Sequence, residues 1–178
     1  MKGDFTRWTF DASNRYSSVR LQQGRVLLDS DWNEQLDISA YRETTANQEI
    51  IGLCGVPDLN SFAPQISDDP QGIKLGQGIC YVDGILCEND KKQTYSPKNK
   101  EEGNGHYLVY LEVWQHHITA IEAPELREQA LGGPDTTTRT QTYWRVQFSK
   151  FNTGKNETTD KWQVKWQTLQ DQKNKKGS

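Results

Sequence analysis

The stretch DSDWNEQLD, residues 29–37, places four carboxylates within nine residues. On a helix, Glu34 and Asp37 would lie on roughly one face, where they could hold a cation. The stretch lacks the alternating oxygen ligands and the central glycine of a calcium-binding loop, and no histidine is close to it in the sequence. Asp31 and Glu34 have instead the spacing of a capping box, with Ser30 as the alternative cap. We therefore predict that a helix begins here, with Asp31 and Glu34 as its cap, and that no metal is bound.

Three cysteines could form a disulfide or contribute to a zinc site. Asp83-Gly84 between two β-prone runs predicts a hairpin in which Cys80 lies opposite Cys87, close enough for a bridge. By count from the turn, this is a hydrogen-bonded pair, where the geometry for a disulfide is less favourable. A zinc site that adds Cys54 is not supported, because the sequence has no CxxC or HxxxH spacing. Buried thiols are the favoured interpretation, and the sequence does not decide whether Cys80 and Cys87 are bridged.

The other reactive groups have no supporting pattern. His116 and His117 are adjacent after a predicted strand, so their side chains point to opposite faces and cannot easily bind one ion together. The stretch LGGPDTTTR at 131–139 lacks the Lys-Ser/Thr ending of a phosphate-binding loop, and no serine lies in a GxSxG motif. We therefore predict no catalytic residue, no cofactor and no enzymatic activity.

Composition and charge exclude several classes of protein. The 178 residues are enough for one domain with a hydrophobic core, although only 33% of them are hydrophobic. A formal net charge of −3 argues against nucleic-acid binding, which normally needs a basic surface. No signal peptide is visible at the N-terminus, and no long apolar run predicts a membrane span. Three cysteines without a framework fit a reducing compartment.

The first third of the chain is predicted to contain an arm and a helix. Residues 1–30 form the polar, aromatic-rich arm, with a short strand RVLL at 25–28. Residues 31–52 form the helix, since no proline or glycine interrupts them before Gly52, which is expected to end it. The apolar stripe of this helix is thin, so we expect a partner to share in its burial.

Residues 53–151 are predicted to form a β-rich domain. The hairpin at 78–88 pairs Val82 with Ile85 and Tyr81 with Leu86. Residues 107–114, YLVYLEVW, are nearly apolar on both faces and predict a central strand. The remaining predicted elements are a continuation of the sheet at 117–123, a short helix at 124–131 and strands at 140–151 and 161–166.

The predicted fold class follows from this order of elements. It is α+β, with a long N-terminal helix and an antiparallel β-rich domain that is sandwich- or barrel-like. Residues 152–178 are expected to hold the last strand and a flexible basic tail.

Three stretches of the chain resemble one known family. They are MKGDFTRWTF followed by VRLQQGRVLLDSDWNEQLDI (19–38), GICYVDGILCEN (78–89), and the block from YLVYLEVW to QTYW (107–144), which includes ALGGPDT. They are similar to blocks of a bacterial family of unassigned domain function that is associated with the baseplate of phage-tail-like contractile injection systems.

The resemblance implies a structural subunit that holds its neighbours in register. Its partners would be other baseplate, spike or sheath proteins, and it would form a homo-oligomer, either a trimer or a hexamer. Assembly is expected in the cytoplasm, into an injection particle that is either membrane-anchored or released. Because aromatic side chains are favoured at interface hot spots, we predict interface contacts for Phe5, Trp8, Phe10, Tyr16 and Trp32. The competing interpretation is that these rings pack within their own subunit.

A different function remains as the alternative. The chain could be a carbohydrate- or receptor-binding β domain of a tail-fibre-like protein. In that case Trp144, Trp162 and Trp166 would line a groove, and the isolated monomer would bind a glycan.

Overall fold

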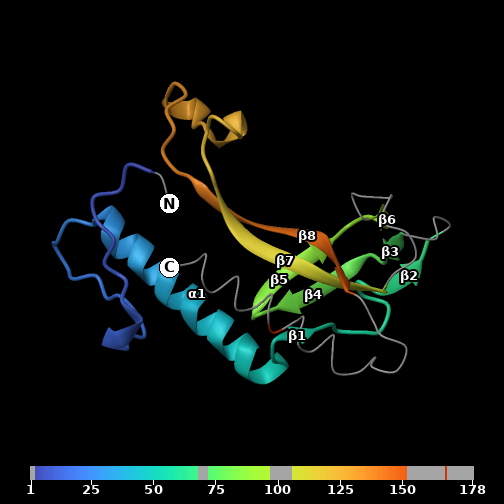
Figure 1. Ribbon diagram of the computed structural model, residues 1–178. Helices are drawn as coiled ribbons and strands as arrows, with labels where there is room; N and C mark the ends of the chain where they lie inside the picture. Colours follow the sequence, from blue (N-terminus) through green and yellow to red (C-terminus); the bar gives the residue numbers. More distant parts are fainter. Residues whose placement is uncertain (1–2, 68–71, 97–105, 152–166, 168–178) are drawn as a thin grey trace. The chain divides into compact units, whose positions relative to one another are not determined.

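The computed structural model describes residues 3–67, 72–96, 106–151 and 167 (Figure 1). The chain divides into two compact units. The first consists of residues 1–62, 77–90 and 113–143, and the second of residues 63–76, 91–112 and 144–178.

The helix α1, Asp29–Ile51, belongs to the first unit (Figure 1). Gly52 ends it, because its φ of 89° is a conformation that favours glycine, and its N–H donates to the Gln48 carbonyl at 3.0 Å. Ser30 and Ile38 are the buried residues of α1. The helix therefore buries little of its surface in the described part of the chain.

The beginning of α1 differs from the sequence prediction by two residues. The helix begins at Asp29, after Leu28 in an extended conformation, and the Asp31 carboxylate accepts from the Leu28 N–H at 3.4 Å. Asp31 thus reaches back to the residue before the helix, whereas Glu34, the second residue of the predicted cap, accepts from Thr9. The earlier start places Asp29 and Asp31 in the first turn, where carboxylates suit the positive end of the helix dipole.

The arm before α1 is irregular. Residues 25–28, predicted as a short strand, form no strand, because no neighbouring strand pairs with them, and Val26 is 83% exposed. Within residues 3–28 the regular element is the 3₁₀ helix η1, Ala12–Asn14. The Asp11 side chain caps it by accepting from the Ser13 N–H at 2.8 Å.

The first unit also contains a three-stranded antiparallel sheet with the order β1-β4-β5. Its strands are Cys54–Gly55, Gly78–Val82 and Ile85–Asn89. Asp83 and Gly84 have φ angles of 52° and 76°, which a type I′ turn needs at both central positions. The register pairs Val82 with Ile85 and Cys80 with Cys87, so the predicted hairpin and its register are confirmed.

The turn of this hairpin contacts the C-terminal half of α1. Asn47 Nδ2 donates to the Gly84 carbonyl at 3.2 Å. Gln48 Nε2 donates to the Asp83 carbonyl at 3.1 Å and to its carboxylate at 2.9 Å. A Cβ atom on Gly84 would lie 2.4 Å from the Thr44 carbonyl oxygen, so the close approach of turn and helix requires a glycine here.

A second small sheet lies in the second unit, with the antiparallel order β2-β3-β6. Its strands are Pro64–Ile66, Ile73–Leu75 and Gln93–Tyr95. Lys74 in the middle strand pairs with Gln65 on one side and with Thr94 on the other. Leu75 of this sheet is buried.

The strands β7, His106–Ile118, and β8, Arg139–Phe151, pair with each other in a two-stranded sheet (Figure 1). The strand predicted at 140–151 is confirmed. The strand predicted at 107–114 exists, but it is not central among the described strands, because β8 is its one neighbour in the sheet. Its apolar faces are partly open, since Val109 is 37% and Trp114 38% exposed. The predicted continuation to 123 ends at Ile118.

Two short 3₁₀ helices stand where one helix was predicted at 124–131. They are η2, Pro124–Leu126, and η3, Gln129–Leu131. The Glu128 N–H donates to the Pro134 carbonyl at 3.0 Å, which interrupts a continuous α-helix. Gly132, with a φ of 87°, ends η3.

The described residues thus have a mixed α+β fold with a β-rich part. Their strands belong to three separate sheets, and none of these sheets closes into a barrel. No α-helix in the described part of the chain has the length and apolar character needed to cross a membrane. The strand predicted at 161–166 and the predicted basic tail lie outside the described residues.

Candidate functional site

Carboxylates at the beginning of α1 hold the N-terminal arm against the helix. Thr6 donates to Asp29 twice, through its backbone N–H at 3.0 Å and through its hydroxyl. The Thr9 hydroxyl donates to Glu34 Oε2 at 2.6 Å. Two of the four carboxylates in the acidic stretch therefore bind the arm, with no cation needed to explain their position.

A third contact fixes the later part of the arm. The Val19 N–H donates to Gln35 Oε1 at 2.8 Å, and Gln35 Nε2 donates in turn to Ser39 Oγ at 3.1 Å. Together with the two threonine contacts, this bond attaches the arm to α1 at residues widely spaced along the arm. Hydrogen bonds thus hold the arm against the first half of α1.

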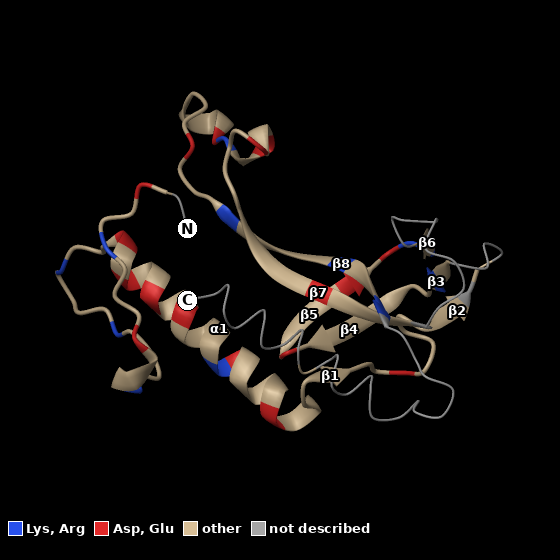
Figure 2. Cartoon of the chain, in the orientation of Figure 1, with Lys and Arg blue, Asp and Glu red and all other residues tan. Residues whose placement is uncertain are grey.

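The acidic residues of α1, red in Figure 2, differ in their pKa values. The hydrogen bonds from Thr6 hold the pKa of Asp29 below its ordinary value of 3.8. Burial raises the pKa of Asp37, and the nearby charge of Glu34 raises it further. The negative charge of Asp29 is therefore stabilised by the docked arm, whereas the charge of Asp37 is disfavoured.

Two of the predicted interface residues pack within the chain. The ring of Phe10 lies 5.8 Å from the ring of Tyr41 in α1, measured between centroids. Phe5 makes edge contacts with Trp8 at 5.8 Å and with His117 of β7 at 6.2 Å. Phe5 and Phe10 are both half-buried, so they help to attach the arm to its own unit.

The other three predicted interface residues are open to solvent. Trp8 is 48% exposed, Tyr16 61% and Trp32 60%. Their positions differ, since Trp8 and Tyr16 lie in the arm and Trp32 lies in the first turns of α1. Of the five predicted interface residues, Trp8, Tyr16 and Trp32 are therefore the ones open to contact with a partner.

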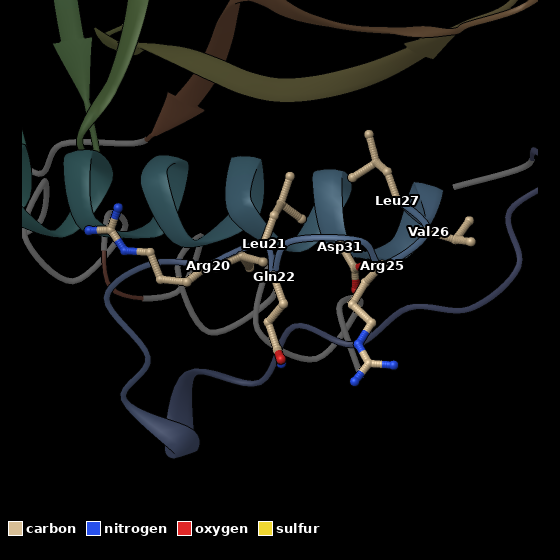
Figure 3. Close-up of a pocket in the computed structure, with 8 residues that line it drawn as sticks. Arg20, Leu21, Gln22, Arg25, Val26, Leu27 and Asp31 are labelled. Carbon is tan, nitrogen blue, oxygen red and sulfur yellow. The ribbon is translucent and has the colours of Figure 1, made fainter.

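A shallow hollow of about 230 Å³ lies where the arm turns back toward α1 (Figure 3). In Figure 3, Leu21 and Leu27 extend to one side of the chain, while Gln22 and Arg25 extend to the other. Asp31 is the residue of α1 that lines the hollow. Leu21 is 65% and Leu27 55% exposed. The segment that precedes Trp32 in the sequence therefore also exposes apolar side chains.

The residues of the alternative glycan-binding groove are not assembled in the described part of the chain. Trp144 of β8 is half-buried and lies 6.3 Å from the ring of Tyr95 in β6. Trp162 and Trp166 lie outside the described residues. His116 pairs with Glu122 at 3.5 Å on the surface, while both ring nitrogens of His117 are buried beside Phe5.

Sequence reasoning missed the partners of the acidic stretch. Thr6 and Thr9 lie more than twenty residues before Asp29 and Glu34, and no local pattern links residues at that separation. The sequence offers only an indirect indication of these bonds. Two threonines stand among the aromatic residues of FTRWTF, and a carboxylate-rich helix start follows later in the chain. Such an arm supplies hydroxyl and backbone donors to the carboxylates of the helix start.

The comparisons with known proteins give one match. The model of a family of unknown function (DUF6519) matches residues 1–175. No curated protein and no solved structure matches the chain.

Proposed function

We propose that this chain, which belongs to the family of unknown function DUF6519, is a structural subunit of a phage-tail-like contractile injection system. In this role it lies in the baseplate or next to the spike and holds neighbouring subunits together. Its partners are further copies of itself, as a trimer or a hexamer, and the baseplate, spike or sheath proteins. The link to such particles rests on the sequence resemblance of the three stretches, and assembly takes place in the cytoplasm.

The observation that carries the proposal is an exposed apolar stripe along α1. Trp32 is 60%, Leu36 52% and Ile50 84% exposed. A helix advances by about 100° per residue, so these three side chains lie within about 40° of one line, with the polar Ser39 and Glu43 between Leu36 and Ile50 on the same side. Apolar side chains on a helix normally face a core, whereas these three are exposed in the described part of the chain.

The other side of α1 already has its partners. Ile38, which lies more than a quarter turn away from the stripe, is 1% exposed. The hairpin turn contacts the same helix through Asn47 and Gln48. The stripe thus points away from Ile38, while Asn47 lies at its edge, and we assign Trp32, Leu36 and Ile50 to contacts with a neighbouring subunit.

The test is a substitution of Trp32 in the stripe. Aromatic anchors at an interface contribute about 2 kcal/mol or more, so we expect Trp32→Ala to weaken incorporation into particles about 30-fold. The melting temperature of the purified chain is expected to stay nearly unchanged, because the indole is mostly exposed. Incorporation is measured as the amount of chain that co-sediments with sheath-containing particles.

Leu59→Ala is the matched control. Leu59 is a large apolar residue that is 92% exposed and lies in the loop between β1 and β2. Its substitution is expected to leave incorporation unchanged. Equal incorporation of the Trp32→Ala variant and the Leu59→Ala variant would contradict the assignment of the stripe to an interface.

The alternative function has less support. Of the three tryptophans assigned to a glycan-binding groove, Trp144 is the one within the described residues, and its ring contacts Tyr95. The exposed aromatic residues Trp8, Tyr16 and Trp32 favour protein contacts, because aromatic side chains are favoured at interface hot spots.

A further inference from the structure

All three cysteines of the chain lie on one face of the sheet β1-β4-β5. Cys80 and Cys87 are opposite each other across the hairpin, so their side chains point to the same face. Cys54 pairs with Val82, which is two residues from Cys80 and therefore shares its face. Strand pairing thus brings Cys54 next to Cys80, although 26 residues separate them in the sequence.

The two members of this neighbouring pair differ in access to solvent. The Sγ atoms of Cys54 and Cys80 are 4.0 Å apart. Cys54 is exposed, Cys80 is 3% exposed, and Cys87 has no exposed surface. A reagent in solution can therefore reach the thiol of Cys54 directly, and Cys80 lies within reach of a sulfur atom attached there.

We propose that Cys54 and Cys80 are an oxidation site, which forms an intramolecular disulfide when the chain meets a low-molecular-weight disulfide. The Cys54 thiolate attacks one sulfur of the small disulfide, forms a mixed disulfide and releases one small thiolate. The Cys80 thiolate then attacks the Cys54 sulfur, forms the internal bridge and releases the second small thiolate. The two protein thiols lose two electrons and two protons, and the small disulfide is reduced to two thiols.

The sulfur chemistry of the cluster agrees with this order of steps. Burial raises the pKa of Cys80 to about 12, and the neighbouring Cys54 contributes to the rise. Burial also raises the pKa of Cys87 to about 11. Both buried groups are therefore thiols near neutral pH, so attack starts at Cys54 and closure by Cys80 is the slower step.

The bridge considered from the sequence, between Cys80 and Cys87, is a poorer candidate. Both thiols are buried, so neither can form the first mixed disulfide without opening the sheet. The pair is also two positions from the closing pair of a two-residue turn, which makes it a hydrogen-bonded pair with less favourable disulfide geometry. Among the described residues, no group of three or more His, Cys, Asp or Glu side chains is placed to hold a metal ion.

A bridge between Cys54 and Cys80 would attach the end of α1 to the hairpin. β1 follows α1 after Gly52 and Leu53, and the Asp83 N–H in the hairpin turn donates to the Leu53 carbonyl at 2.9 Å. The disulfide would restrain the opening of β1 from β4. It therefore predicts slower hydrogen exchange at the Asp83 amide in the oxidised chain than in the reduced chain.

The test treats the full chain with oxidised glutathione at mildly alkaline pH, alkylates the remaining thiols and digests the protein with trypsin without reduction. Trypsin cleaves after Arg42, Lys74 and Lys91, so Cys54 lies in one peptide and Cys80 and Cys87 lie together in the next. We expect the two peptides to be joined, with fragmentation placing the bridge at Cys80. The melting temperature is expected to rise on the order of 5–10 °C and to return on reduction.

Two variants separate the possible bridges. Cys87→Ala is expected to retain the joined peptides, whereas Cys80→Ala is expected to lose them. A bridge that fragmentation places at Cys87, or a wild-type chain in which Cys54 stays linked to glutathione, would overturn the proposal. Fragmentation of the wild-type peptides gives this answer even where a cysteine variant fails to fold.

Discussion

The four carboxylates at the start of α1 have different roles although they are close in sequence. Asp29 and Glu34 accept hydrogen bonds from the arm, and Asp31 accepts from the backbone before the helix. Asp37 has a raised pKa, because burial and the charge of Glu34 disfavour its ionised form. Protonation of Asp37 therefore favours the folded state, whereas protonation of Asp29 opposes it.

Asp29 gives a prediction about the pH dependence of arm docking. Thr6 lowers the pKa of Asp29 below 3.8 in the folded chain. The carboxylate therefore stabilises the docked arm at pH values above the ordinary pKa, and this stabilisation is lost as the pH falls through the lowered pKa. We expect the Thr6 amide to lose its protection from hydrogen exchange, and to shift in the NMR spectrum, as the pH falls below 3.8.

The control for this prediction is Asp29→Asn. The asparagine keeps an acceptor oxygen but has no titrating carboxyl group, so the pH-dependent change at Thr6 should disappear. An unchanged titration at Thr6 in this variant would show that another group controls the docking of the arm.

At the scale of elements, the contact between α1 and the hairpin depends on one glycine. Gly84 has a φ of 76°, and a Cβ atom there would meet the Thr44 carbonyl oxygen. Gly24 in the arm has a similar φ of 70°, but a Cβ atom there would meet nothing within 4 Å. The two positions share the same backbone conformation and differ in the close approach of a neighbour.

This difference predicts unequal effects of alanine on stability. Gly24→Ala is expected to destabilise the chain by about 1 kcal/mol, because a residue with a Cβ atom is disfavoured at positive φ. Gly84→Ala is expected to lower the free energy of unfolding by on the order of 3 kcal/mol, since turn and helix must also move apart. Chemical denaturation of both variants measures the two values. Equal losses would mean that the contact with Thr44 contributes nothing.

The hairpin was predictable from the sequence because its determinants are local. Asp83-Gly84 fixes both the turn type and the pairing of the residues beside it. The end of α1 at Gly52 has a similar local cause, a glycine after a run without helix breakers. In both cases a few adjacent residues specify the backbone conformation.

Features that depend on contacts between distant residues were harder to predict from the sequence. The apolar faces of residues 107–114 indicate burial, but they do not tell whether a neighbouring strand or another subunit supplies it, and β7 has β8 as its one partner among the described strands. The strand predicted at 25–28 failed for the same reason, since strand formation needs a partner. The bonds from Thr6 and Thr9 to the acidic stretch connect segments that no sequence period relates.

At the scale of the whole molecule, the described residues bury few large apolar side chains. The buried apolar residues among them are Ile38, Phe62, Leu75, Cys80, Cys87 and Ala120. Meanwhile the arm and α1 leave Trp8, Tyr16 and Trp32 open. A subunit that completes its burial against neighbours has this distribution, which is the physical basis of the proposed structural role.

The measurement that tests this account most directly is the stoichiometry of the chain in native particles. Sheath-containing particles are purified from the host by sedimentation, and quantitative mass spectrometry compares the chain with the spike and sheath proteins. We predict that the chain co-sediments at a fixed multiple of three or six per spike. Intact particles that contain no copy of the chain would contradict the structural role.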